Sequence, residues 1–577
     1  MTAPSKRRSV PGRCLLADRG KTGYAIIVAE NASRSETHAA NELQRFLEQA
    51  TGAQFPLLDD TVPPRQREIM VGRSRHTQAL GQGLSFDDLG DEGFRICTVG
   101  EHLLIAGGRL RGTLYGVYRF LEREVGCRWY TARVSKVPRH ARLAVGPLDV
   151  AERPVLEYRE PFFREAFDGD WAARNLANSS HATLGAQHGG KVKYGPFVHT
   201  FETLLPVATH FAEHPGWYSE IDGKRISERP QLCLTNPEVR ERVIEGVRKW
   251  IKDMPDATIF SVSQNDWTNP CQCAKCKAID DREGSPIGSI LTFVNQVAEA
   301  IEPEAPHVAI DTLAYWYSRK PPKTIRPRRN VIVRLCSIEC CFAHPLESSC
   351  EANRKFADDI RGWSKIADRL YIWDYVTNFH NYMMPWPNFG VLGPNVRFFV
   401  KHHVRGLFEQ GSYASGGGGE AAEMRAYVLA KLLWDPTIDE RKVRDEFIAG
   451  VYGKAADKVR KYVDLIHEPV ADPNVHMHIF CDVSNPHLTD EVIRRGDELL
   501  SEAEAKAESE EVRKRVEVAH LPIQYVRIRK MDKEDPERAR LLDRFLAITK
   551  REGFLNISEG HTIEEWAKHG AVEPGKW

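Results

Sequence analysis

The sequence lacks the features that mark several special classes of protein. No apolar run approaches the roughly 20 residues that span a bilayer, so no membrane span is expected. Lys and Arg together number 80, and so do Asp and Glu. This balance leaves no basic stripe or acidic tail for a nucleic acid or a membrane surface. The glycine run Gly416–Gly419 is not followed by the Lys-Ser/Thr of a phosphate-binding loop, and no G-x-G-x-x-G motif occurs.

The N-terminus and the cysteines exclude two further classes. The opening segment, MTAPSKRRSVPGRCLLADRG, has basic residues but no apolar core of about 7–15 residues, so no secretory signal is visible. We therefore expect a cytoplasmic protein, or a periplasmic or secreted one if the numbered start lies downstream of a signal. Twelve cysteines in 577 residues do not make a disulfide scaffold.

What is present is an ordinary globular composition in a chain too long for one compact domain. We expect three parts: an α+β domain over 1–150, a (β/α)₈ TIM barrel over 151–450, and a helical C-terminal region over 451–577. In the first part, Tyr24–Ala29 reads as a strand, and Ser35 opens an amphipathic helix that stops at Gly52. The runs 94–99 and 102–106 read as a hairpin.

The barrel is predicted from repeated strand-then-helix units, which indicate a parallel sheet. Helical patterns such as 237–253, 286–302, 351–367 and 420–433 separate most of the strand-like runs. The strand-like runs are 155–163, 231–235, 257–263, 307–316, 330–338, 369–376 and 404–409. An eighth strand is expected near 176–204. After Trp434 the strands stop, and the runs 455–467, 489–518 and 536–552 read as helices packed on the barrel.

Polar residues at the expected strand ends are the candidates for function, because barrel active sites lie there. Carboxylates can act as acid, base or nucleophile at a glycosidic bond, and aromatic faces can stack on sugar rings. Asp266 ranks first, with Asn265 before it as an amide that orients a reacting group; a turn-forming Asn-Asp pair is the structural alternative. Glu409 is the fallback acid or base. The residues expected to hold a sugar are His199, Trp217, Tyr218, Trp316, Glu339, Asp374, Tyr375 and Asn378.

The C-x-C-x-x-C spacing of Cys271, Cys273 and Cys276 suggests a structural zinc site. A local disulfide or unligated thiols are the alternatives. The sequence does not identify a fourth ligand. The candidates, if the strands bring them near, are Cys336, Cys340, Cys341, His344 and Cys350. No cofactor is otherwise required.

Several segments carry a resemblance to known families. RGTLYGVYRFLEREVGCRWY (111–130) is similar to the end of the domain that precedes the barrel in family 20 hexosaminidases and α-glucuronidases. HPGWYSEIDGKR, SVSQNDWTNPCQCAKC and FEQGSYASGGGGEAAEMRAYVLAKLLWDP resemble domain of unknown function 4838, some of whose members are classed as glycoside hydrolase family 163. The resemblance covers about residues 22 to 465.

This resemblance implies a hydrolase that acts on N-acetylhexosamine-containing glycans and retains configuration by using the substrate's own acetamide as nucleophile. Asn265 and Asp266 match the adjacent Asp-Glu of family 20 enzymes, and the shorter Asp266 places the acid about one methylene further back. Two alternatives stay open. An α-glucuronidase-like exo-hydrolase would need a cation such as Arg159 or Arg334 for the uronate, and a non-catalytic carbohydrate-binding protein would keep only the scaffold. The sequence leaves the oligomeric state undetermined.

Overall fold

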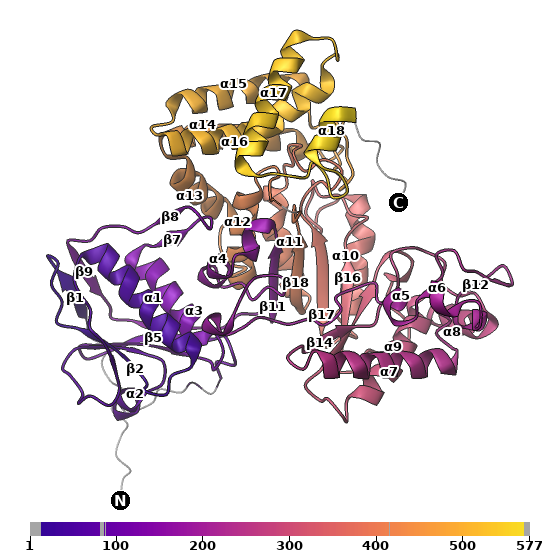
Figure 1. The fold of residues 1–577 in the computed structure, drawn as a ribbon, viewed down its shortest axis with the longest axis horizontal. Coiled ribbons are helices and arrows are strands. Elements are labelled where there is room, and N and C mark those ends of the chain that lie inside the picture. The colour runs from indigo at the N-terminus through magenta and orange to yellow at the C-terminus, as the bar shows by residue number, and fades with distance from the viewer. Residues whose placement is uncertain (1–12, 81–85, 87, 415, 570–577) are drawn as a thin grey trace, which may run out of the picture.

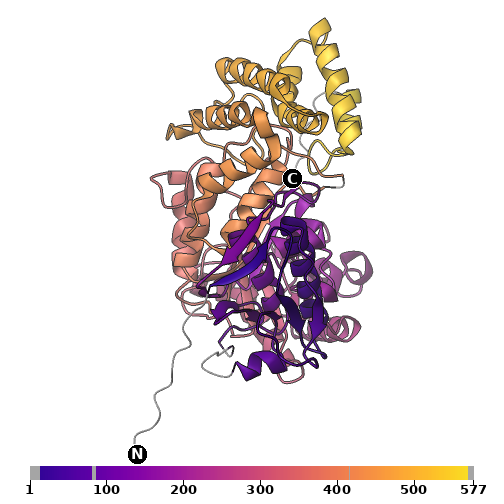
Figure 2. The ribbon, with the colours of Figure 1, turned by 90° about the vertical axis from the view of Figure 1, so that its left-hand side faces the viewer.

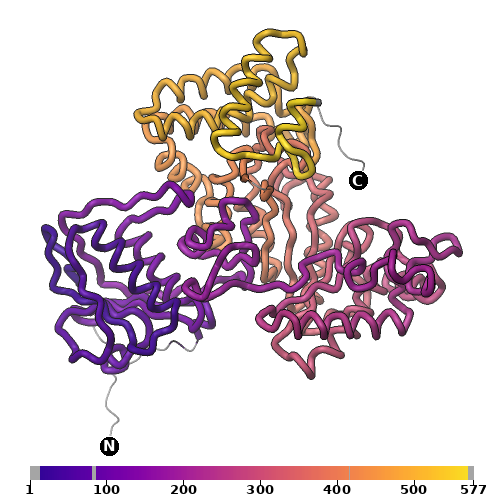
Figure 3. Tube along the Cα trace, in the orientation of Figure 1, coloured from indigo at the N-terminus to yellow at the C-terminus, as the bar shows by residue number. Residues whose placement is uncertain are grey.

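The computed structural model describes residues 13–80, 86, 88–414 and 416–569. Three groups of elements surround a central parallel sheet (Figure 1). The N-terminal elements lie on one side of it, the helices around α7–α9 on the other, and the C-terminal helices lie beyond one end of its strands (Figures 1 and 3). No helix in the described ranges is long and apolar enough to cross a membrane.

The N-terminal part is a six-stranded mixed sheet in the order β10-β5-β6-β4-β2-β3. Its strands are β2 (Ala25–Val28), β3 (Leu57–Asp59), β4 (Glu68–Val71), β5 (Phe94–Val99), β6 (His102–Gly107) and β10 (Asp149–Glu152). Helix α1 (Arg34–Thr51) ends at Gly52, as predicted, and the φ of Gly52 is a left-handed 73°. It begins at a Ser33 capping box, two residues before the Ser35 that was expected from the sequence. The predicted hairpin is confirmed, since β5 and β6 pair antiparallel.

After the short helix α2 (Arg75–Ala79), a third N-terminal helix, α3 (Gly112–Phe120), continues into a π-helical turn (Leu121–Val125) and ends at Gly126. Helices α1 and α3 are seen side by side against the N-terminal sheet in Figure 1. The view in Figure 2 faces this N-terminal part and shows the C-terminal helices above it. Outside the sheet, β1 (Cys14–Asp18) pairs with β9 (Arg142–Val145), and β7 (Arg128–Trp129) pairs with β8 (Ser135–Lys136).

The central sheet has six parallel strands in the order β11-β18-β17-β16-β15-β14. They are β11 (Tyr158–Phe162), β14 (Ile259–Ser261), β15 (Ala309–Ala314), β16 (Val331–Cys336), β17 (Leu370–Tyr375) and β18 (Val404–Gln410). Side chains from all six strands meet in one buried cluster that includes Tyr158, Ile259, Ile332 and Phe408. Because strands at opposite edges share a core, the sheet is curled into part of a barrel.

The expectation of eight barrel strands is met only in part. The gap between β11 and β14 is spanned by an irregular segment, in which Tyr194 makes one parallel bridge with Ile259 and Asn178 accepts a hydrogen bond from the Arg159 amide. Left-handed φ angles at Leu176, Gly189, Gly190 and His199 interrupt this stretch, which prevents the extended conformation that a regular strand needs.

The strand predicted at 231–235 is wrong. There the chain forms a single antiparallel bridge, Tyr218 with Leu232, and the Cys233 amide donates to the Trp217 carbonyl at 2.7 Å. Pro230 and Pro237 bound this stretch, and a proline cannot extend a ladder by donating a hydrogen bond. The segment therefore pairs with a local excursion of the chain instead of with the central sheet.

Helices alternate with the strands of the central sheet. They are α7 (Pro237–Asp253), α8 (Ala274–Glu283), α9 (Ile287–Ile301), α10 (Glu351–Trp363), α11 (Phe389–Lys401) and α12 (Ala422–Trp434). Helices α9, α11 and α12 pack against the strands, and α7 and α8 pack on α9. The short helices α4 (Gly169–Arg174), α5 (Phe201–Leu204) and α6 (Val207–His210) lie in the loops.

The C-terminal region is helical, as predicted. It contains α13 (Glu440–Tyr452), α14 (Ala456–His467), α15 (Asp490–Lys506), α16 (Glu510–Lys530), α17 (Pro536–Glu552) and α18 (Ile563–His569). The one long helix expected over 489–518 is instead divided between α15 and α16, because Ser509 adopts an extended conformation and accepts the amide of Val512 as an N-cap.

Candidate active site

A cavity of about 250 Å³ lies where the central strands end. It is closed on one side by residues of the C-terminal region. The described residues that line it are His199, Asp266, Leu313, Tyr315, Trp316, Cys336, Ile338, Trp373, Tyr375, Phe379, Gln410, Tyr413, Ile479, Phe480 and Glu559. Ligand sites occur at this edge of parallel α/β sheets because the loops after the strands converge there.

Asp266 follows β14 and projects into this cavity with 44% of its side chain exposed. The Tyr315 hydroxyl donates to its Oδ1 at 3.1 Å. His199 lies on the other side, with Nε2 4.0 Å from the same oxygen. Its Nδ1 is 2.9 Å from the Gln264 carbonyl, which can only accept, so Nδ1 carries a proton and Nε2 is the ring nitrogen that faces the cavity.

A second carboxyl, that of Glu559, reaches the cavity from the loop between α17 and α18. The Tyr413 hydroxyl donates to its Oε1 at 3.0 Å and the Gln410 amide at 3.2 Å. Burial raises the pKa of Glu559 above its usual value, and the charge of Asp266 adds to this shift. The two carboxyls therefore share a cavity but differ in environment, and Glu559 keeps its proton to higher pH than an ordinary glutamate.

Aromatic rings form much of the cavity wall. Tyr315 and Trp316 stack with centroids 4.7 Å apart, and Trp373 stacks with Tyr375 at 6.0 Å. Trp316 has a φ of 52° and His199 a φ of 56°. A left-handed backbone is costly for such residues and is retained mainly where the surrounding structure fixes it, often at functional sites.

Asn265 does not line the cavity. Its side chain is only 2% exposed, its Oδ1 accepts the Glu202 amide at 2.8 Å, and its Nδ2 donates to the Pro230 carbonyl at 3.2 Å. Gln231 holds the same loop, since its side chain bonds both the amide and the carbonyl of Asn265. In this structure the amide that precedes Asp266 fixes the loop that carries Asp266.

Asp374 and Glu409 pair across neighbouring strands but face away from the cavity. Strand side chains alternate between the two faces of a sheet, and the cavity-lining residues are their neighbours Trp373, Tyr375 and Gln410. Burial raises the pKa of Asp374 to about 6. Burial, followed by the charge of Asp374, raises that of Glu409 well above its usual value. This buried acid pair therefore lies on the outer face of the central sheet, on the side of the surrounding helices.

Of the other sugar-binding candidates, His199, Trp316 and Tyr375 line the cavity, while the rest lie elsewhere. Trp217 donates to Glu238, and the Tyr218 hydroxyl donates to the Leu205 carbonyl inside the hydrophobic core. Asn378 donates to the Cys481 carbonyl at 2.8 Å. Glu339 is exposed and pairs with Arg319.

Sequence reasoning missed the C-terminal contribution to this site. Glu559, Ile479 and Phe480 all lie in polar or irregular stretches of a region that was read only as packing helices. The one available signal was the segment Ile557–His561, a break between helical patterns that contains a carboxylate. Nothing in the sequence indicates which strand end such a distant loop approaches.

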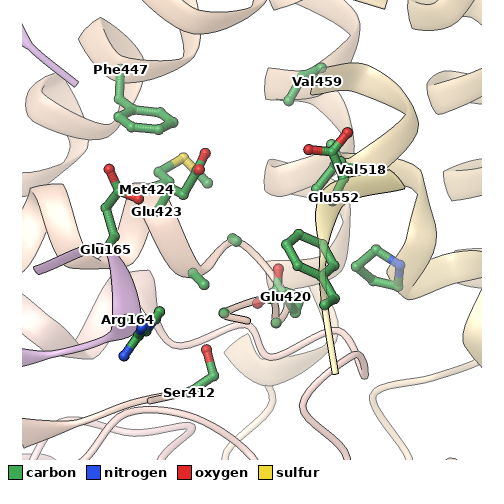
Figure 4. Close-up of a pocket in the computed structure, with 18 of the residues that line it drawn as sticks. Arg164, Glu165, Ser412, Glu420, Glu423, Met424, Phe447, Val459, Val518 and Glu552 are labelled. Carbon is green, nitrogen blue, oxygen red and sulfur yellow. The ribbon is translucent and has the colours of Figure 1, made fainter. Parts of the chain in front are cut away.

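A second cavity, of about 150 Å³, lies beside the glycine run, between the ends of β11 and β18 and the C-terminal helices. Glu165, Glu420, Glu423 and Glu552 line it, as Figure 4 shows. Burial, with the charge of Glu423, raises the pKa of Glu165 to about 7. Among the described residues of its wall, no two aromatic rings stack on each other. Since sugar rings pack on aromatic walls, the cavity at the ends of the central strands fits a sugar better.

The predicted metal loop gains its fourth thiol from Cys233. The Sγ atoms of Cys233, Cys271, Cys273 and Cys276 lie within 4.8 Å of one another, and all four residues are buried. None of the five fourth-ligand candidates named from the sequence joins this group. Cys233 was not among them because it stands 38 residues before Cys271, in the stretch that was expected to be a barrel strand.

Comparison with known proteins identifies the family of this chain. Residues 129–464 match the family described as Domain of unknown function (DUF4838). The chain belongs to this family. Residues 18–120 match the family described as Glycosyl hydrolase family 67 N-terminus. No curated protein matches the chain.

Solved structures show how the fold of this DUF4838 protein relates to others. A family GH115 4-O-methyl-α-glucuronidase, BtGH115A, whose stated specificity is for decorated arabinogalactans, is 12% identical with a TM-score of 0.57 over 95% of this chain and 78% of that one. CpGH84B is 11% identical with a TM-score of 0.48 over 98% of each chain. A mutant Streptomyces plicatus β-hexosaminidase in complex with its product GlcNAc is 11% identical with a TM-score of 0.42 over 76% of this chain and 91% of that one. The first of these likenesses shows a shared fold.

Proposed function

We propose that this DUF4838 protein is a glycoside hydrolase that acts on N-acetylhexosamine-containing glycans. The observation that carries the proposal is the cavity at the strand ends, where Asp266 and Glu559 face an aromatic wall. Two carboxyls with different environments are the chemistry that glycosidic bond cleavage needs. The match of residues 18–120 to a glycosyl hydrolase N-terminus supports the same class of reaction.

The environments of the two carboxyls suggest a division of roles. Glu559, whose pKa is raised by burial, protonates the glycosidic oxygen as the bond to the anomeric carbon breaks. The acetamide carbonyl oxygen of the substrate forms the new bond to that carbon, and Asp266 accepts the acetamide N–H and stabilises the positive charge that develops there. Water then attacks the anomeric carbon, which opens the cyclic intermediate, and gives a proton to the Glu559 carboxylate.

The lining of the cavity favours an acetamido sugar over a uronic acid. An acetamide methyl needs apolar contacts, which Trp373, Tyr375 and Phe379 supply. A uronate needs a cation, and no Lys or Arg occurs among the described residues of this wall. Arg334 is fully buried against Asp311, and Arg159 is fully buried against Glu92, so neither of the cations named from the sequence is free at the cavity.

The test is a parallel assay of the full chain on an aryl N-acetyl-β-glucosaminide, an aryl glucuronide and an N-glycan. We expect release from the N-acetylglucosaminide or the glycan, with kcat reduced about 10²–10⁴-fold in both Asp266→Asn and Glu559→Gln. Glu339→Gln is the matched control, because this carboxyl also follows a central strand but lies outside the cavity.

Two outcomes would contradict the proposal. Turnover of the glucuronide alone would favour the uronidase alternative, and glycan binding without any hydrolysis on prolonged incubation would favour a non-catalytic binding protein. The pH profile separates the roles of the two carboxyls. As proton donor, Glu559 must be protonated, so activity falls as pH rises through its pKa, and residual activity of Glu559→Gln should lack this alkaline decline. If Asp266→Asn loses the decline instead, Asp266 is the proton donor.

A further inference from the structure

A second group of metal-ligand side chains joins the mouth of the central sheet to the C-terminal region. Cys341, His344 and Cys350 lie in the loop between β16 and α10, and His476 comes from the stretch between α14 and α15. One ligand atom from each of the four lies within 4.8 Å of the others. The two cysteines are buried, and His476 closes the group from the surface.

The distances fit a tetrahedral ion. The Cys341 Sγ lies 3.5 Å from His344 Nδ1 and 3.4 Å from His476 Nδ1, and the Cys350 Sγ lies 3.7 Å from His476 Nδ1. A tetrahedral zinc with bonds of about 2.3 Å to sulfur and about 2.0–2.1 Å to nitrogen places such ligand pairs about 3.5 Å apart. The Cys233 and Cys273 sulfurs of the other group are 3.7 Å apart, against about 3.8 Å for two thiolates on one zinc.

The surroundings hold both groups in a geometry suited to a metal. The Nε2 of His344 lies 3.3 Å from the Asp472 carbonyl, which leaves Nδ1 as the ring's acceptor, and metal-bound histidines are commonly oriented by such a bond. Asn353 bonds the backbone of both Cys341 and His344. In the first group, the Cys271 sulfur accepts the Glu220 amide at 3.4 Å, and Cys273 occupies the N-cap position of α8, where the helix dipole favours a thiolate.

A third group of possible metal ligands lacks a free donor atom on one of its histidines. His38, Asp170 and His188 also come together, but both ring nitrogens of His188 are already engaged. Its Nε2 bonds Asp170 at 2.9 Å and its Nδ1 accepts the Gly185 amide. Because no lone pair of His188 is left for an ion, this group is an ordinary hydrogen-bonded cluster.

We propose that the protein binds two structural zinc ions, one by Cys233, Cys271, Cys273 and Cys276, and one by Cys341, His344, Cys350 and His476. Tetrahedral sets of four thiolates, or of two thiolates and two imidazoles, are the donor sets that zinc prefers. All eight ligands are protein side chains, so neither ion has an open position for catalysis. All twelve cysteines of the chain are free thiols, which leaves both sets available to a metal.

The second zinc fixes one wall of the candidate active site. Directly after His476, the Met477 carbonyl accepts the Phe342 amide at 2.9 Å, and the Ile479 carbonyl accepts the Phe379 amide at 2.8 Å. Ile479 and Phe480 then line the cavity. Binding of zinc by His476 therefore holds the segment from His476 to Phe480 against the loop after β16. Without the ion, this segment, which forms one wall of the cavity, loses that attachment. This consequence rests on the proposed function, whereas the presence of zinc does not.

The test measures zinc per chain in the full-length protein after loading with zinc alone and removal of unbound metal. We expect two zinc ions in the unmodified chain, one in His476→Ala, one in Cys276→Ser, and none in the double variant. His478→Ala is the matched control, because it is an exposed histidine two residues away on the same segment and belongs to no group. It should keep both ions.

The zinc that remains in each single variant reports that the rest of the chain is folded, so loss of one ion is not confused with unfolding. One zinc or none in the loaded unmodified chain, or two in His476→Ala, would overturn the two-site proposal. Where a substrate is turned over, His476→Ala should raise KM several-fold more than it lowers kcat. If His476→Ala loses one zinc but keeps its KM, the second zinc site is supported and its effect on the cavity is contradicted.

Discussion

At the scale of single residues, the direction in which a carboxyl side chain points separates the candidate catalytic groups from the structural ones. Asp266 and Glu559 face the cavity, whereas Asp374 and Glu409 form an acid pair on the face of β17 and β18 that points away from it. All but Glu559 could be named from the sequence as carboxylates near strand ends. Which face each of them takes depends on the register of the strand, and a shift of one residue reverses it.

The acid pair predicts a dependence of stability on pH. The pKa of Asp374 in the folded state is about 6, above the usual value of an aspartate. The folded chain therefore binds more protons than the unfolded one, and stability falls as pH rises from about 4 to about 6. Asp374 contributes about 3 kcal/mol to this decline at most, since one pKa unit corresponds to about 1.4 kcal/mol. Glu409, whose pKa burial also raises, extends the decline to higher pH.

We expect Asp374→Asn to reduce this decline and leave the part that belongs to Glu409, when the free energy of unfolding is measured by denaturant titration between pH 4 and pH 7. Glu339→Gln, which removes an exposed carboxyl, should keep it. A decline of the same size in Asp374→Asn would show that Asp374 is not the group responsible.

At the scale of elements, sequence signals locate helix ends well where a cap is local. Gly52 ends α1 as its position predicts, while the helix begins at the Ser33 cap, two residues before the predicted Ser35. The break between α15 and α16 was missed because the helical pattern runs through it, and the Ser509 cap competes with continued helix at similar free energy. Tertiary contacts between the two helices decide in favour of the turn.

Ser509→Ala should therefore destabilise the protein by about 1 kcal/mol, because the amide of Val512 loses its partner. The measurement is the free energy of unfolding by urea, with Ser501→Ala as the control. Ser501 is exposed inside α15 and has no capping role, so its replacement should be neutral or slightly stabilising. Equal effects of the two substitutions would argue against the cap.

At the scale of the whole molecule, buried ion pairs join the N-terminal part to the central sheet. Glu122, in the π-helical turn, pairs with Lys431 of α12 and with Arg119. Burial opposes the charge of Glu122, but these two cations outweigh it and lower its pKa to about 2. A lowered pKa means that the pair stabilises the fold above the ordinary glutamate pKa and that this stability is lost as pH falls toward 2.

Glu122→Gln should cost about 3–5 kcal/mol at pH 7, because Lys431 is left buried without its partner. The cost should shrink as the pH approaches 2, which unfolding curves at pH 7 and at pH 3 would show as a smaller difference between variant and unmodified chain. Glu124→Gln, two residues along and less buried, is the control and should have little effect at either pH. A cost that does not change with pH would mean that packing, not charge, accounts for it.

The sequence by itself determined the order of the elements, the parallel central sheet and the position of Asp266 after one of its strands, because hydrophobic periodicity and local caps encode these features over short distances. Only the tertiary structure decided which side chains share a site. It brought Glu559 to Asp266, Cys233 to the C-x-C-x-x-C loop, and His476 to Cys341 and Cys350. These contacts join residues tens to hundreds of positions apart, and no local pattern along the chain records which distant loop will close over a given strand end.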